Sequence, residues 1–152
     1  MARRPVVAAA AAAGSPDELE AEFYLALRHG DIERLMAVWA DDDEIVCVHP
    51  GGGRVIGAAA IRASFEAIFS AGGGIPVQIE QVHRLQQLGF ALHHLVERID
   101  VTGPQGVQQA CVLSTNLYVK TLQGWRLASH HASPGSMAEM SAQDGDAPST
   151  LH

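Results

Sequence analysis

The sequence predicts an α+β fold in which three N-terminal helices pack on a strongly curved antiparallel sheet. Apolar residues recur at helical spacing in the segments before residue 75. From Ile75 onward, long strand-like segments alternate with short turn-forming sequences. Helices grouped before hairpin-linked strands are typical of α+β domains. Long strands joined by short hairpins tend to curl around the helices, so we expect a cone-shaped α+β barrel with an apolar pocket inside.

The first helix is predicted to begin at Pro16. Ser15 can serve as its N-cap, Pro16 suits the first helical position, and Glu18 completes a capping box. Gly30 is expected to end the helix, because glycine adopts the left-handed conformation without strain. The apolar stripe of this helix consists of Leu19, Phe23, Ala26 and Leu27.

Two further helices and a short strand follow. Asp31 is the expected N-cap of the second helix, and the acidic run 41–44 ends it as a solvated turn. A short buried strand at 45–48 leads into a glycine loop, and the sequence 71–74 closes the third helix. The apolar stripes are Ile32, Leu35, Met36 and Trp39 in the second helix, and Ile61, Phe65, Ile68 and Phe69 in the third.

Four long strands complete a single domain that we place at 15–135. They are expected at about 75–88, 90–101, 107–121 and 125–133. The alanine-rich segment 1–14 is interpreted as a disordered extension and 136–152 as a disordered tail. Two arginines before the alanine run also resemble a secretory leader, which leaves export as an alternative. The weak hydrophobicity of alanine favours a cytosolic extension.

Composition excludes several classes of partner. With 17 acidic and 10 basic residues, the net charge is −7, whereas nucleic acid and anionic membranes require a basic surface. No apolar run approaches the length of a membrane span. Cys47 and Cys111 lie in separate apolar runs without a C-x-x-C pair, which indicates buried thiols in a reducing cytoplasm. We therefore expect a cytoplasmic protein that binds neither nucleic acid nor membrane.

His49 is the first candidate functional residue. It follows the apolar strand 45–48 directly, and Pro50 and the glycines 51–53 come next. Imidazole titrates near neutral pH, so a shielded histidine at this position can donate or accept a proton. The alternative is a histidine that hydrogen-bonds to a backbone carbonyl and only closes the mouth of the pocket.

Three segments carry a resemblance to a known family. They are FYLALRHGDIERLMAVWADDDEIVCVHPGG at 23–52, the G-x-x-x-I opening of the third helix at Gly57 and Ile61, and GWRLASHHASP at 124–134. With these segments the region 15–135 resembles the SnoaL-like proteins of the nuclear-transport-factor-2-like superfamily. The resemblance implies the cone fold. It does not imply one reaction, since the superfamily includes isomerases, cyclases, dehydratases, epoxide hydrolases and non-catalytic assembly domains.

Within that superfamily, the segment from Tyr24 to Glu33 is similar to ketosteroid isomerase. The resemblance implies that Tyr24 donates a hydrogen bond to a developing oxyanion and that His49, just before Pro50, stands at the position of the catalytic base. Asn116 stands near the second oxyanion donor. Histidine and asparagine replace two aspartates of that enzyme, so we expect a polar trio facing a pocket and not a ketosteroid reaction.

Further pocket residues are expected on the strands. Adjacent residues of a strand face opposite ways, so only one of His93 and His94 can face inward, and likewise one of His130 and His131. The register of the resemblance places His94 and Arg98 inside, with ordinary sheet-surface charges at Glu97 and Arg98 as the alternative. Alternation along Trp125, Leu127, Ser129 and His131 favours His131. The expected pocket lining is Trp39, His94, Arg98 and His131.

Two functional hypotheses remain open. The first is a cofactor-independent enzyme that isomerises, cyclises, dehydrates or hydrolyses a largely apolar or amphipathic molecule, with His49, Tyr24 and Asn116 as catalytic residues. The second is a non-catalytic ligand-binding or association module. The resemblance implies that the association domain of calcium/calmodulin-dependent kinase II uses the same cone as such a module. An H-x-S feature in the closing strand of that domain matches His131 and Ser133.

Both hypotheses predict a homodimer. The sheet face away from the helices should carry apolar residues, such as Val77, Ile79 and Leu113, that a second copy can cover. A metal shared by His49, His94 and His131 would be possible on three strands, but no ligand spacing supports it. We therefore expect neither a metal nor a cofactor.

Overall fold

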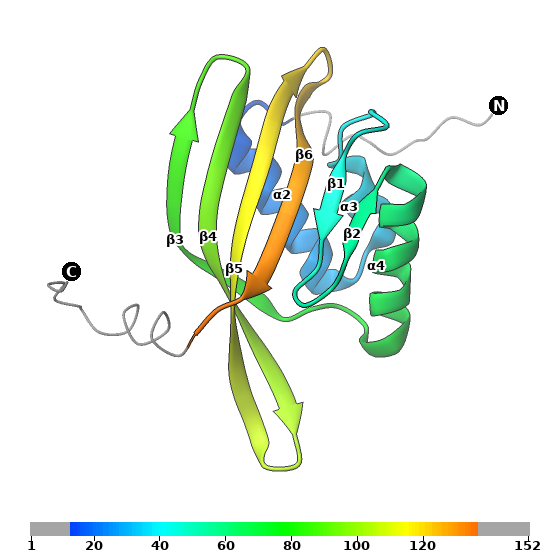
Figure 1. The fold of residues 1–152 in the computed structure, drawn as a ribbon, viewed down its shortest axis with the longest axis vertical. Helices are drawn as coiled ribbons and strands as arrows, with labels where there is room; N and C mark the ends of the chain where they lie inside the picture. The colour runs from blue at the N-terminus through cyan, green and yellow to red at the C-terminus, as the bar shows by residue number, and fades with distance from the viewer. Residues whose placement is uncertain (1–12, 137–152) are drawn as a thin grey trace, which may run out of the picture.

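The structure is a computed structural model that describes residues 13–136. The expected extension 1–14 and tail 136–152 therefore lie almost entirely outside the described residues. Figure 1 shows the helices on one side of a curved sheet and a long twisted hairpin that extends beyond the body of the domain. The elements are α2 (Pro16–His29), α3 (Ile32–Ala37), β1 (Val46–Val48), β2 (Arg54–Ile56), α4 (Ala58–Gly72), β3 (Val77–Gln86), β4 (Phe90–Gly103), β5 (Gly106–Thr121) and β6 (Gly124–Pro134).

The predicted ends of the first helix are confirmed. Ser15 Oγ accepts a hydrogen bond from the N–H of Glu18 at 3.1 Å, and Gly30 takes the left-handed conformation with φ 65°. The Glu18 carboxylate accepts the N–H of Gly14 at 2.7 Å, so it satisfies a donor just before the cap residue. Asp31 caps α3 as predicted, accepting the N–H of Arg34 at 3.1 Å. Local polar residues thus set the boundaries of these helices.

The sheet is mostly antiparallel and does not close. Its strand order is β2-β1-β6-β5-β4-β3, which leaves β2 and β3 as edges. The β1–β6 pair is parallel, with Cys47 opposite His130; this departs from a purely antiparallel sheet. The strand Arg54–Ile56 was not predicted, because its three residues lie next to a glycine loop. Among the described residues, no helix combines the length and apolar character needed to cross a membrane.

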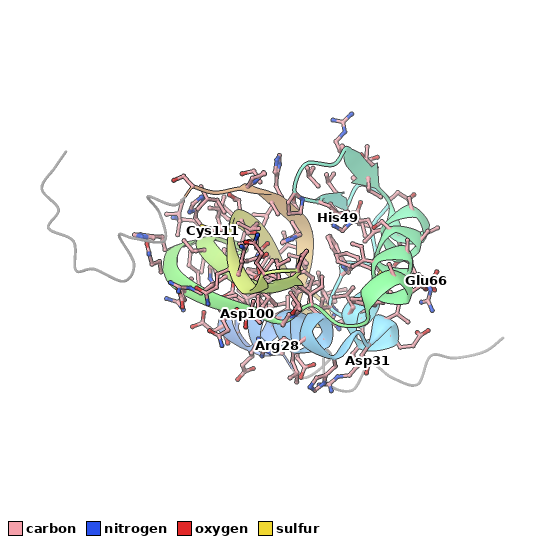
Figure 2. The ribbon with its side chains drawn as sticks, turned by 90° about the horizontal axis from the view of Figure 1, so that it is seen from below. Arg28, Asp31, His49, Glu66, Asp100 and Cys111 are labelled. Atoms are coloured by element: carbon pink, nitrogen blue, oxygen red, sulfur yellow. The ribbon has the colours of Figure 1, made fainter. Side chains whose placement is uncertain are left out.

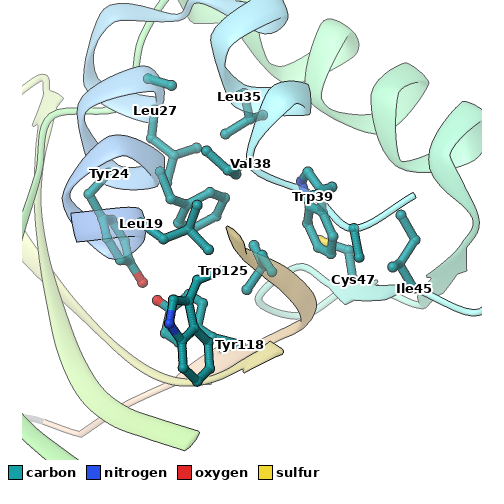
Figure 3. Close-up of a cluster of buried hydrophobic side chains, with 14 of the residues drawn as sticks. Leu19, Tyr24, Leu27, Leu35, Val38, Trp39, Ile45, Cys47, Tyr118 and Trp125 are labelled. Atoms are coloured by element: carbon teal, nitrogen blue, oxygen red, sulfur yellow. The ribbon is translucent and has the colours of Figure 1, made fainter. Parts of the chain in front are cut away.

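The main core lies between α2, α3, α4 and the inner face of the sheet. Figure 3 shows Leu19 and Leu27 of α2 and Leu35 of α3 in one cluster with the aromatic rings. Trp39 belongs to this core, but not as part of a helix, because α3 ends at Ala37. Its backbone forms an isolated parallel bridge to Leu127. The second predicted helix is therefore shorter than expected.

Two bulges interrupt the alternation of the sheet faces. In β3 the register shifts between Glu80 and His83, where Gln81 has φ 54°. In β6, Leu117 pairs with Ser129 but the next residue, Tyr118, pairs with Leu127, so Ala128 is the extra residue. A bulge reverses which side chains face inward beyond it. The face assignment made for residues 125–131 from simple alternation therefore fails after Leu127.

Gly74 packs so closely against the backbone at the end of α2 that no side chain fits at this position. A Cβ built on it would lie 2.0 Å from the carbonyl oxygen of Arg28 and 3.0 Å from the backbone N of Gly30. The connection from α4 to β3 thus crosses the end of α2 backbone to backbone. Beside it, the N–H of Ile75 donates to the carbonyl of Leu27 at 2.9 Å.

We predict that Gly74→Ala lowers the free energy of unfolding by about 2–3 kcal/mol or more, because the clash involves backbone that cannot rotate away. Urea denaturation measures this change. Gly72→Ala is the matched control, since nothing lies within 4 Å of a Cβ at Gly72. Equal losses in the two variants would contradict the close-contact explanation.

Candidate functional site

Polar side chains lie inside the cone, on the sheet face that the helices cover. The buried polar and charged residues of this interior are Glu20, His93, Glu97, Ser114, Asn116 and His130, and the tyrosines Tyr24 and Tyr118 are buried with them. Figure 3 shows the hydroxyl groups of Tyr24 and Tyr118 directed into the same space between α2 and the sheet. Because each buried polar group needs a partner, the hydrogen bonds among these residues define the site.

One chain of hydrogen bonds runs from β4 to β6. Tyr24 donates to Glu97 Oε2 at 2.6 Å, and Ser114 donates to the same oxygen at 2.8 Å. Asn116 Nδ2 donates to the Tyr24 hydroxyl at 3.0 Å. His130 Nδ1 lies 2.6 Å from Asn116 Oδ1. Since the amide oxygen can only accept, the His130 ring carries its proton on Nδ1 and has its lone pair on Nε2.

A second group centres on Glu20 of α2. Its Oε2 accepts from Tyr118 at 2.7 Å and from His93 Nδ1 at 2.9 Å. The two carboxylates are close enough that the charge of Glu20 helps to raise the pKa of Glu97. The cone interior therefore contains two acidic groups, each bound by two donors.

His49 lies at the edge of this interior. Figure 2 shows it between the β1–β2 hairpin and α4. Its Nε2 is 2.9 Å from Ser64 Oγ, and Ser64 itself donates to the carbonyl of Ile61 at 2.7 Å. The serine oxygen must then accept, so His49 is protonated on Nε2 and has its lone pair on Nδ1. The ring also packs edge-on against Phe65, with centroids 4.8 Å apart.

Burial keeps both imidazoles neutral. It lowers the pKa of His130 to about 3, and the nearby rings of His49 and His131 add to that lowering. Burial also lowers the pKa of the half-buried His49. A charged ring loses its water shell on burial, and neither ring has a carboxylate partner to compensate. At neutral pH each ring therefore has one free lone pair.

The acidic and thiol groups are shifted in the other direction. Burial raises the pKa of Glu97, although the hydrogen bonds from Tyr24 and Ser114 oppose this. Burial raises the pKa of Tyr24 well above its usual value, and the charge of Glu97 adds to the effect. The Cys47 thiol, whose pKa rises to about 12, stays protonated. Cys47 and Cys111 are both buried, as predicted, and neither forms a disulfide.

The structure brings together part of the expected catalytic trio. Tyr24 and Asn116 are directly hydrogen-bonded. His49 forms a hydrogen bond with neither Tyr24 nor Asn116, but its ring helps to lower the pKa of the buried His130. His130 therefore stands between His49 and the other two residues of the trio.

Three expected pocket residues lie on the opposite face of the sheet. His94 and His131 are exposed, while their neighbours His93 and His130 are buried. For His131 the reason is the bulge at Ala128, which reverses the face. For His94, no bulge intervenes, and the register carried over from the resemblance was wrong by one residue.

Arg98 shares the outer face with His94. Its guanidinium pairs with Glu80 Oε1 at 3.2 Å and donates to Gln109 at 2.9 Å. It is thus a charge of the sheet surface, the alternative interpretation considered for it. Glu97, given the same alternative, lies inside instead. Strand pairing explains this position. Glu97 lies opposite the buried Val112 and His93 lies opposite the buried Asn116, so all four side chains face the interior.

Sequence reasoning missed Glu20, His93, Glu97 and His130 as inward-facing residues. On β4 both faces mix apolar and ionisable residues, so alternation gives no preference. For Glu20 a signal existed: it is four residues before Tyr24, and residues at that spacing share a helix face. The register of β5 would have identified the rest, because Asn116 pairs with His93 on one side and His130 on the other.

Two hollows open at the surface of the described chain. One, of about 490 Å³, lies between α3, the start of α4 and the β5–β6 hairpin, and Trp39, Arg62 and Arg126 line it. Trp39 is thus a pocket residue, but of this hollow. The other, of about 530 Å³, lies on the outer sheet face and includes His94 and His131. Open space also borders Gly51 and Gly53 beside His49.

The buried neutral His130 predicts that stability falls as the pH drops from 6.5 toward about 3. Over that interval the unfolded chain takes up a proton at this imidazole and the folded protein does not, so protonation favours unfolding. The full effect is on the order of 5 kcal/mol. The raised pKa of Glu97 changes stability in the opposite direction. As the pH rises above 4.5, the unfolded chain loses a proton that the folded protein retains at Glu97, so stability falls.

Urea denaturation between about pH 4 and pH 7 tests this pH dependence. His130→Gln, which retains an amide to bond Asn116, should show a shallower loss of stability in acid than the wild type. His83→Gln, a change in an exposed ring of β3, should keep the wild-type slope. Identical slopes for all three proteins would assign the acid sensitivity to another group.

The sequence matches the SnoaL-like domain family over residues 17–137. A Thiobacillus denitrificans structure, provisionally assigned as a calcium/calmodulin-dependent protein kinase type II association domain, is 31% identical with a TM-score of 0.74. That match covers 82% of this chain and 98% of the other. A Streptomyces avermitilis protein, provisionally assigned as an NTF2-like dehydratase, is 30% identical with a TM-score of 0.69, covering 77% and 91% of the two chains.

A more distant structure shares the fold alone. The ketosteroid isomerase-like protein of Erwinia carotovora atroseptica is 19% identical with a TM-score of 0.65, and the match covers 79% of this chain and 93% of the other. No curated protein gives a significant match. The family match includes every strand and helix that contributes to the cone interior, and the chain therefore belongs to the SnoaL-like domain family.

Proposed function

We propose that this protein transfers protons on a small, largely apolar molecule, without a cofactor, using its two neutral imidazoles. The observation that carries the proposal is the hydrogen bond from His130 Nδ1 to Asn116 Oδ1, which leaves the lone pair on Nε2. The fixed tautomer lets the ring accept a proton at Nε2 without reorienting, although a pKa of about 3 makes it a weaker base than a free imidazole.

His49 supplies the second proton-handling group. Its lone pair is on Nδ1 because Nε2–H donates to Ser64. The ring is half-buried beside the glycine loop, where open space borders Gly51 and Gly53. A substrate that entered from this side would meet His49 first. In an isomerisation or dehydration, the ring that removes a proton from carbon becomes an imidazolium, and it then returns that proton to another carbon or to the departing hydroxyl.

Tyr24 and Asn116 position the base in this proposal, which revises the oxyanion role implied by ketosteroid isomerase. The Tyr24 hydroxyl donates its proton to Glu97, and the side-chain oxygen of Asn116 accepts a hydrogen bond from His130. Their geometry therefore fixes the His130 ring. The apolar character of the substrate follows from the aromatic rings around both imidazoles: Phe23 lies 5.2 Å from His130 and Phe65 lies 4.8 Å from His49, measured between ring centroids.

Solvent-deuterium incorporation into a panel of apolar enolisable ketones, together with hydrolysis of apolar epoxides, tests the proposed chemistry. We expect turnover by the wild type that falls about 10²–10⁴-fold in His130→Gln and in His49→Gln, the range lost with a general acid or base. His29→Gln and His83→Gln, changes in two exposed rings outside the proposed site and interface, are the controls and should retain wild-type rates. Background rates in every protein would refute an enzymatic role.

A second proposal concerns association with another copy of the chain. The outer hollow is lined by Leu92, Leu113 and Leu117 together with His94, Thr115 and His131. The last three residues pair in one row across β4, β5 and β6. Such an apolar sheet face is typical of an interface. The association-domain assignment of the Thiobacillus denitrificans structure supports it. Leu113 fits the earlier expectation, but Val77 and Ile79 do not, because they pack in the main core.

The wild type is expected to have twice the 16.1 kDa chain mass in solution. Leu113→Asp should produce a monomer, because it places a charge in the proposed apolar interface. Light scattering after size exclusion measures both. Leu122→Asp, a change in an exposed leucine of the β5–β6 turn, is the matched control and should remain dimeric. A monomeric wild type at micromolar concentration would rule the interface out.

A further inference from the structure

One imidazole nitrogen at the α2 end of the interior has no hydrogen-bond partner. His93 is 0% exposed, and its Nε2 is buried without a donor or acceptor. Its other nitrogen donates to Glu20 Oε2 at 2.9 Å. Because Glu20 holds the ring proton on Nδ1, the lone pair of His93 is on Nε2. A buried lone pair without a partner is costly, so a missing partner is expected there.

Asp17 faces that lone pair. Its Oδ1 lies 3.9 Å from His93 Nε2, too far for a hydrogen bond. Two ligands that each lie about 2.0–2.2 Å from one ion can be separated by this distance. One ligand atom from each of Asp17, Glu20 and His93 lies within 4.8 Å of the others. The helix sets this arrangement, because residues three apart on α2 project from the same side.

We propose that Asp17 and His93 bind a divalent transition-metal cation, such as Zn²⁺, at the first turn of α2. The imidazole and carboxylate donors suit such an ion. Glu20 orients the ring from behind, as carboxylates commonly do for metal-binding histidines. Water completes the coordination. This site is separate from the proton-transfer residues His49 and His130, and the inference does not depend on the proposed function.

Arg84 competes with the cation for Asp17. Its Nε donates to Asp17 Oδ1 at 2.9 Å, but the two side chains are 48% and 62% exposed. An ion pair this exposed contributes little stability, so a metal ion can displace it. The positive end of the α2 dipole also opposes a cation. The acidic residues Asp17, Glu18 and Glu20 together offset both effects.

Titration calorimetry of the chelator-treated full chain with zinc chloride tests the site. The wild type should bind one equivalent. Asp17→Asn should weaken binding at least about tenfold, and His93→Gln should abolish it. Arg84→Gln should bind more tightly, because the competing charge is gone. The matched control is Arg34→Gln, which removes a similar pair with Glu22 on the same helix and should bind as the wild type does.

The exposed variants keep the test decisive if His93→Gln fails to fold. Asp17 and Arg84 lie at the surface, and circular dichroism will show whether their variants fold. A second readout is the absorption spectrum of bound Co²⁺, which reports nitrogen and oxygen ligands. No saturable zinc binding by the wild type would overturn the proposal. So would equal affinities of the wild type, Asp17→Asn and Arg84→Gln, because the ion would then bind elsewhere, at surface histidines such as His94 and His131.

Discussion

Two carboxylates inside an apolar cone constrain the rest of this structure. Glu20 and Glu97 are 3% and 5% exposed, and an ionisable group at that depth is tolerated only with well-placed donors. Each has two: Tyr118 and His93 on Glu20, and Tyr24 and Ser114 on Glu97. Leaving one such partner unmet costs about 1–3 kcal/mol. The donors come from α2, β4 and β5, so satisfying them fixes how the helix sits on the sheet.

The hydrogen bonds between α2 and β4 run in both directions. Glu20 of the helix accepts from His93 of the strand, whereas Tyr24 of the helix donates to Glu97 of the strand. Residues four apart share a face in both a helix and a strand. The helix therefore cannot rotate or slide against β4 without breaking both contacts. Apolar packing alone would be less selective, because leucine side chains tolerate small shifts.

The same network prepares the site for chemistry. Asn116 connects Tyr24 to His130 and so determines which nitrogen of that ring is free. Burial keeps the ring neutral, and its hydrogen-bond partner is the amide oxygen of Asn116 and not a carboxylate that would stabilise the charged form. The two faces of the sheet therefore carry different kinds of side chain. The inner face holds oriented polar groups, and the outer face presents leucines together with His94, Thr115 and His131. A fold of this kind supports several functions, so the residues of each face decide between them.

The sequence by itself determined the order of the secondary structure and most of its elements, but not the strand Arg54–Ile56 or the early end of α3. Caps at Ser15 and Asp31, the stop at Gly30 and the apolar stripes are local signals, because each acts through neighbouring backbone atoms. The resemblance to ketosteroid isomerase also indicated Tyr24 and Asn116 as pocket-facing polar residues, and both are buried.

Only the tertiary structure decided which histidines face inward. Their orientation depends on strand register and on one extra residue at Ala128, and pairing between distant strands sets both. A shift of one residue reverses every side chain of a strand while leaving its local sequence pattern unchanged. Partners 73 residues apart in the chain, such as Tyr24 and Glu97, are likewise joined by the fold alone.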